Sequence, residues 1–166
     1  MRRLVTAVAL FVAYVACTAT AGAAGCSLTL PSTLSVGSYD PTRIGWSSIV
    51  TFTVMYACDA GTFATNLTIT AGLGTHAAGT FATRNMAAGG ADLLNYWLYP
   101  PGYTVTPHSS ANVWGDGSGL SKVWGPFSVA GGATATSGTA SIQVDGNQDI
   151  AAGTYSDPVV FTMTFI

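Results

Sequence analysis

The residues best suited to catalysis or metal binding are few, and they do not combine into a recognisable site. Two histidines, His76 and His108, lie in loop-like sequence, and neither has a second ligand at the spacing that metal sites require. The glycines of residues 114–119 do not fit a phosphate-binding fingerprint, and no G-x-S-x-G motif occurs. The seven aspartates are scattered, and glutamate is absent. We therefore expect no catalytic residues, no metal and no cofactor.

One short segment has the first residues of a calcium-binding loop. Residues 145–149 (DGNQD) alternate acidic or amide side chains with other residues. However, the sixth position of the loop is Ile150 where glycine is needed, and the twelfth is Ser156 where glutamate is needed. Asp-Gly-Asn is also a strong turn former. We therefore interpret this segment as a β-turn.

The first 24 residues have the organisation of an export signal. Arg2 and Arg3 precede an apolar run, Leu4–Ala16, and small residues follow it. The A-x-A pattern at residues 21–23 predicts cleavage after Ala23 or Ala24. Residues 1–24 would then be removed, and residues 25–166 would form a single domain, a size typical of one folding unit.

Two alternatives to a cleaved signal stay open. The apolar run could be a membrane anchor, although it is shorter than the roughly 20 apolar residues that a spanning helix needs. Alternatively, Cys26 could carry a lipid, because residues 23–26 (AAGC) loosely match a lipobox. A branched apolar residue normally stands where Ala23 does, which weakens that interpretation.

The cysteines agree with export to an oxidising compartment. Cys17 lies in the predicted signal, so the mature chain keeps Cys26 and Cys58. An even pair in an exported protein most simply forms a disulfide. Closing a loop of about 32 residues would stabilise the domain by roughly 3–4 kcal/mol in the chain-entropy description. Two free buried thiols are the alternative.

The predicted mature chain is anionic. Its cations are Arg43, Arg84 and Lys122, against seven aspartates, which gives a net charge of about −4. So few cations cannot neutralise a phosphate backbone, and they match an anionic membrane surface poorly. We expect no nucleic-acid partner and no stable membrane insertion after signal cleavage.

Apolar residues alternate with polar ones in five segments after the signal. Such alternation is typical of half-buried β-strands, and helix-favouring Lys, Arg and Glu are nearly absent. Glycine and proline clusters separate the segments, which predicts a single all-β sandwich or barrel. The residues expected to share a face within each segment are Val50, Phe52, Val54 and Tyr56; Phe63, Leu67 and Ile69; Leu94, Tyr96 and Leu98; Ile142 and Val144; and Val159, Phe161, Met163 and Phe165.

The last of these segments continues to Ile166 without a polar tail. An apolar strand with an open edge tends to pair with another chain. We therefore expect this strand to be paired in the working form of the protein.

Several segments, taken in order, resemble the spore coat protein U domain, which is also the subunit domain of archaic chaperone–usher pili. Each segment is a weak signal alone, but their order and spacing cover essentially the whole mature chain. They are Cys26 with residues 36–41 (VGSYDP), Cys58 at a strand end, residues 84–86 (RNM), residues 94–99 (LNYWLY), residues 114–117 (WGDG) and residues 152–157 (AGTYSD).

The resemblance implies an immunoglobulin-like, pilin-type β-sandwich that lacks one strand. In the family, a periplasmic chaperone lends a strand to the resulting groove, and a neighbouring subunit later replaces it; an outer-membrane usher and other pilus or coat subunits are the further partners. The groove residues implied here are Val159, Phe161, Met163 and Phe165, with the terminal carboxylate of Ile166 available to a chaperone. These residues can equally be ordinary core residues, because the groove is a core with one strand absent.

The chain departs from the family pattern before its first mature cysteine. Polymerising members carry a donor strand of roughly ten residues there, whereas Gly25, with or without Ala24, would precede Cys26 here. We therefore expect a subunit that accepts a strand but can hardly give one: a terminal or accessory subunit, or a coat-type protein.

The leading hypothesis is a structural subunit of a cell-surface pilus or spore coat, exported through the periplasm and without catalytic activity. The alternative is a stand-alone secreted adhesin, with Tyr103 and Trp114 stacking on sugar rings. Arg84 and Asp157 could form an ion pair, worth about 0–1 kcal/mol if it is exposed.

Overall fold

The computed structural model describes residues 7–17, 25–42, 44–103, 105 and 110–165. These residues form ten β-strands and one turn of 3-10 helix, η1 (Ser110–Asn112). No helix within them is long and apolar enough to span a bilayer. The all-β prediction is therefore confirmed for the part of the chain that the structure describes.

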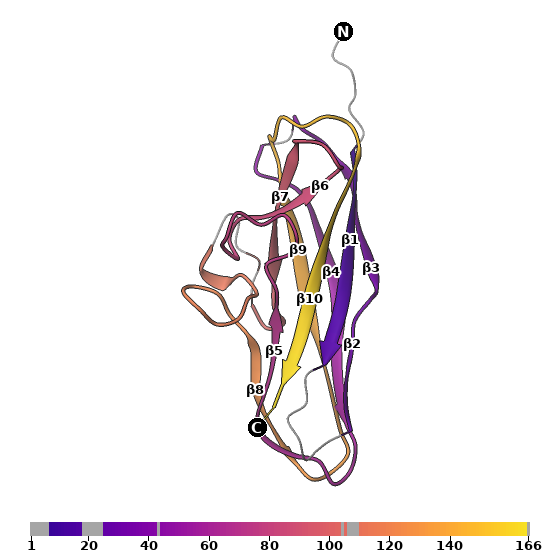
Figure 1. Cartoon of the computed structure of the whole chain (residues 1–166), viewed down its shortest axis with the longest axis vertical. Helices are drawn as coiled ribbons and strands as arrows, with labels where there is room; N and C mark the ends of the chain where they lie inside the picture. The colour runs from indigo at the N-terminus through magenta and orange to yellow at the C-terminus, as the bar shows by residue number, and fades with distance from the viewer. Residues whose placement is uncertain (1–6, 18–24, 43, 104, 106–109, 166) are drawn as a thin grey trace.

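The strands form an elongated β-sandwich (Figure 1). Along one sheet lie, in order, β2 (Cys26–Thr29), β4 (Trp46–Cys58), β9 (Thr134–Asp145), β7 (Leu93–Tyr99) and β6 (Arg84–Ala87). Along the other lie β3 (Thr33–Tyr39), β1 (Ala7–Cys17), β10 (Thr154–Thr164), β5 (Phe63–Ala71) and β8 (Trp124–Ala130). A pairing of Ser156 with Ala87 joins β10 to β6 and thus links the two sheets.

The core lies between the sheets, where the predicted alternation places most of its apolar residues. Phe52, Val54 and Tyr56 of β4 are buried, while the intervening Thr51 and Thr53 are exposed. β7, β9 and β10 confirm the same pattern. Their buried residues are Leu94, Tyr96, Leu98, Ile142, Val144, Val159, Phe161, Met163 and Phe165. β-branched and aromatic side chains suit such a half-buried pleated surface.

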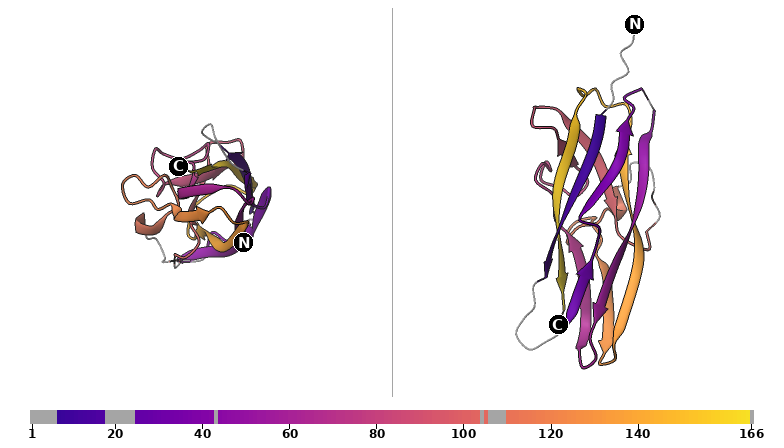
Figure 2. Two further views of the ribbon diagram at one scale, coloured as in Figure 1. Left: turned by 90° about the horizontal axis from the view of Figure 1, so that it is seen from below. Right: turned by 90° about the vertical axis from the view of Figure 1, so that its right-hand side faces the viewer.

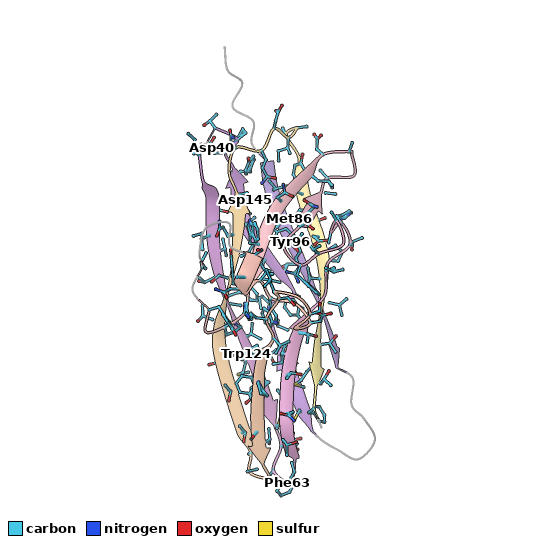
Figure 3. All side chains as sticks on the ribbon, turned by 90° about the vertical axis from the view of Figure 1, so that its left-hand side faces the viewer. Asp40, Phe63, Met86, Tyr96, Trp124 and Asp145 are labelled. Atoms are coloured by element: carbon cyan, nitrogen blue, oxygen red, sulfur yellow. A yellow bond between two sulfur atoms is a disulfide. The ribbon has the colours of Figure 1, made fainter. Side chains whose placement is uncertain are left out.

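The prediction for Phe63 is wrong. Phe63 is 71% exposed and lies at one end of the molecule, whereas Leu67 and Ile69 of the same strand are fully buried (Figure 3). The pairing of β5 with β8 shifts register between Ala64 and Leu67. Such a β-bulge inserts an extra residue and reverses which side chains face inward. Ala64 is therefore buried in place of Phe63.

The segment expected to be a turn connects β9 to β10. Asn147 has φ 55°, a left-handed conformation common for asparagine in turns. The Asp145 carboxylate accepts hydrogen bonds from the indole Nε1 of Trp97, at 2.9 Å to each oxygen. Among the described residues, no three His, Cys, Asp or Glu side chains gather closely enough to hold a metal ion.

Candidate functional site

The predicted groove residues all lie on β10, near the middle of its sheet. Val159, Phe161 and Met163 are fully buried, and Phe165 just beyond the strand is 5% exposed. They alternate with Val160, which is 44% exposed on the opposite face. Ile166 lies outside the described residues. The structure thus brings the four described groove candidates together on the inner face of one strand.

Aromatic packing fixes this inner face. The rings of Phe161 and Trp114 meet edge to face, with centroids 5.0 Å apart, a favourable geometry for an aromatic pair. The indole Nε1 of Trp114 donates to the carbonyl of Ile69, 2.9 Å away on β5. Trp114 is fully buried, so the expectation that it stacks on a sugar is wrong; Tyr103, the other candidate, is 38% exposed.

β1 occupies the position between β10 and β3. It runs parallel to β10, from Val8 opposite Thr154 to Cys17 opposite Met163. Its other edge pairs antiparallel with β3, from Ala7 opposite Tyr39 to Val12 opposite Thr33. Figure 2 shows β1 in indigo lying beside the yellow β10. β1 consists of residues that the sequence assigns to the cleaved signal.

β10 and β3 depend on β1 to share a sheet. Adjacent strands lie about 4.8 Å apart, so strands on either side of β1 are roughly 9.6 Å apart, too far for backbone hydrogen bonds. Among the described strands, β3 pairs with β1 alone. Taking β1 away would leave an open edge on β3 and another on β10.

A bulge in β3 marks this position. The β1–β3 register shifts between Ala9 and Leu10, so that Gly37 and Ser35 stand opposite them and Val36 is the extra residue. Gly37 has φ 81°, a conformation that glycine adopts at no steric cost. Val36 is 4% exposed and joins the core. The bulge thus turns β3 so that its apolar residue covers the core beside β1.

A buried cation lies beside β10. Arg84 at the start of β6 is completely buried, and its guanidinium donates to the carbonyl oxygens of Gly72 (2.7 Å), Trp114 (2.6 Å), Ala71 (3.3 Å) and Phe81 (3.3 Å). Burial lowers the Arg84 pKa to about 10, while nearby Tyr96 and Asp157 act in the opposite direction. Arg84 therefore ties the β5–β6 connection and the segment around Trp114 to one point.

Asp157 of β10 is the buried anion near this cation. Its carboxylate accepts from the Tyr96 hydroxyl (2.6 Å) and from the Thr75 amide (2.7 Å), and it lies 3.4 Å from His76 Nδ1. Burial first, and then the charge of Asp157, raise the pKa of Tyr96 well above its usual value. Gly74 has φ 86°, and a Cβ there would lie 2.0 Å from the Asp157 carboxylate.

The expected exposed Arg84–Asp157 pair is therefore corrected. Both side chains are fully buried, and each is satisfied by other partners. Together they hold the 71–76 segment and Tyr96 of β7 against the first half of β10. This arrangement is structural, because its polar atoms are used in hydrogen bonds within the fold. His76 is the half-exposed member; His108, the other histidine, lies outside the described residues.

The disulfide forms between Cys26 and Cys58, which face each other across the β2–β4 pair. β2 is only four residues long and pairs with β4 alone among the described strands. The bond thus fastens the first strand after the predicted cleavage site to the longest strand of its sheet. In this structure the Cys26 sulfur is used by the disulfide.

Comparison with known proteins agrees with this architecture. The sequence profile of the Spore Coat Protein U domain matches residues 10–162, which is most of the chain. The chain therefore belongs to the spore coat protein U domain family. The match begins within β1. No match was found among curated proteins.

A solved structure shows a similar fold. It is the crystal structure of the CsuC–CsuE chaperone–tip adhesion subunit pre-assembly complex, from archaic chaperone–usher Csu pili of Acinetobacter baumannii. One chain of it superimposes with a TM-score of 0.51 at 17% sequence identity. The likeness covers 86% of this chain but only 40% of that chain. It supports the fold and leaves the role of this chain to be proposed.

Sequence reasoning missed two features of the site. It assigned residues 7–17 only to a signal, although their valine and aromatic content also suits a strand. It also treated Arg84 and Asp157 as surface residues. Their place in matched segments was the available signal, because charged residues are rare in this chain.

Proposed function

We propose that this protein is a structural subunit of a bacterial surface fibre or coat, and that it assembles by accepting a β-strand from a partner. The observation that carries the proposal is the position between β10 and β3, which is filled by residues of the predicted export signal. Cleavage after Ala23 or Ala24 removes that strand. The exported domain then has a vacant strand position beside its own core.

Physical chemistry favours a strand as the partner. Open edges on β10 and β3 offer unpaired N–H and C=O groups to an incoming backbone. Added strands gain affinity from main-chain hydrogen bonds and specificity from alternate side chains that enter pockets. Val159, Phe161 and Met163 face the core at this position and would contribute its apolar wall. A hydrophobic strand is therefore the ligand that satisfies both edges.

The proposed partners follow from the family and the fold. A periplasmic chaperone would supply the first strand, and an outer-membrane usher and other pilus or coat subunits would handle the later exchange. The solved complex named above contains a chaperone with a tip adhesion subunit of a pilus. Cleavage before Cys26 leaves too few residues for a donor strand, so we place this protein at a terminal or accessory position, or in a coat.

The test compares two charge substitutions on β10. Met163→Asp puts a carboxylate on the buried inner face, whereas Thr164→Asp puts one on the exposed face of the neighbouring residue. Each variant is exported together with a periplasmic chaperone of the chaperone–usher class, and the captured fraction is measured by co-purification. We expect Met163→Asp to lose about tenfold or more, because a strand cannot desolvate the charge, and Thr164→Asp to be captured normally.

A second variant guards against a trivial folding defect. Deletion of residues 160–166 shortens the acceptor strand and should abolish capture, while secreted Met163→Leu should retain it because volume and polarity are nearly preserved. Equal capture of Met163→Asp and Thr164→Asp would remove the basis for a strand-accepting role.

A further inference from the structure

β1 has a composition that suits a strand as well as an export signal. Residues 7–17 (AVALFVAYVAC) contain three valines, a phenylalanine and a tyrosine, and no charged residue, glycine or proline. β-branched and aromatic residues favour strands, and runs that are apolar throughout are typical of parallel strands within sheets. The same residues can therefore serve export first and strand pairing afterwards.

The backbone of β1 is paired on both edges. Ten register positions join it to β10, and its first half also pairs with β3. It lies within the sheet between two other strands, so none of its first six residues has a free edge. A second strand cannot enter the same position while β1 is there, because the edges of β10 and β3 are already used.

We infer that residues 7–17 are an intramolecular occupant of the strand-accepting position, and that the unprocessed chain is closed to partner strands until this segment leaves. The inference rests on the proposed function, since the same position is assigned to a partner. It adds a regulatory step. Removal of residues 1–24 both releases the protein from export and opens its binding site.

The covalent link makes the intramolecular strand a strong competitor. A segment joined by a short connection acts at an effective concentration in the millimolar range. A free strand of equal intrinsic affinity at micromolar concentration would therefore be disfavoured by about a thousandfold. Exchange becomes favourable only when the connection through residues 18–25 is cut and the segment can dissociate.

The experiment uses the full chain, produced without processing under oxidising conditions. The probe is a fluorescent synthetic peptide of residues 7–17 with Cys17 replaced by Ser and a lysine tail for solubility. Peptide binding is measured by fluorescence anisotropy on the unaltered chain, on a Val12→Pro/Tyr14→Pro variant, and on an Arg3→Pro control whose proline precedes β1. Proline removes backbone donors and is excluded from central strands.

We expect the unaltered chain and Arg3→Pro to bind the probe about a hundredfold or more weakly than the double-proline variant. Equal binding by all three chains would overturn the inference. So would a double-proline variant that binds no better than the unaltered chain while retaining its β-sheet circular dichroism.

A second measurement covers a double-proline variant that fails to fold. A protease site is placed within residues 18–24 of the unaltered chain, and the cut protein is passed over a sizing column. The N-terminal fragment should co-elute with the domain and be displaced by excess unlabelled probe; immediate separation would overturn the inference. If the fragment is retained but the processed domain captures no chaperone, the proposed function fails instead.

Discussion

At the scale of single residues, the chain concentrates its rare charges where they order loops. Arg84 is one of five cationic residues in the sequence, yet it is completely buried. It donates to four carbonyl oxygens that come from the end of β5, the following connection and the Trp114 segment. An exposed arginine would contribute little, whereas a buried one leaves several unsatisfied groups when it is removed.

We predict that Arg84→Met lowers the free energy of unfolding by about 3 kcal/mol or more, since buried carbonyl groups lose their donor. Lys122→Met is the matched control, because its ammonium has no hydrogen bond or ion pair among the described residues. That change should remain within about 0.5 kcal/mol. Urea unfolding of both variants makes the measurement, and similar losses in the two would contradict a structural role for Arg84.

At the scale of strands, burial depends on sheet register as well as on alternation. Phe63 and Phe161 each belong to an alternating run in the sequence. The bulge between Ala64 and Leu67 turns Phe63 outward, where its ring lies over Gly131, while regular pairing keeps Phe161 inside against Trp114. The same residue type therefore has two different energetic roles.

We predict that Phe161→Ala lowers the free energy of unfolding by about 3–5 kcal/mol, because it leaves a cavity at the centre of the acceptor strand. Phe63→Ala should lower it by less than about 1 kcal/mol, since that ring is already largely in water. Thermal or denaturant unfolding of the two variants checks the difference. Comparable losses would mean that the β5 register does not separate these rings.

At the scale of the whole molecule, the chain is completed by its own first strand and fastened by one covalent link. β1 closes the sheet between β10 and β3, while the disulfide holds β2 to β4 in the opposite sheet. β2 contributes only four residues to pairing, and two of its side chains are exposed. Its attachment therefore depends strongly on the disulfide.

We predict that the Cys26→Ser/Cys58→Ser double variant loses roughly 3–4 kcal/mol of stability in the chain-entropy description, because the 32-residue loop is no longer closed in the unfolded state. Protection of β2 amides from hydrogen exchange should fall more than protection of β9 amides. Adding a reductant to the unaltered protein should reproduce the loss, and a variant with unchanged stability would refute it.

The sequence by itself determined the all-β class, most of the inward-facing residues and the cysteine pair, because these follow from period-two alternation, turn chemistry and an even cysteine count. It also located the face of β10 that carries Val159, Phe161 and Met163. Only the tertiary structure decided that Phe63 points outward, that Arg84 and Asp157 are buried, and that residues 7–17 lie between β10 and β3. These depend on a bulge, on carbonyl groups from distant segments and on pairing between chain ends, none of which local residue patterns encode.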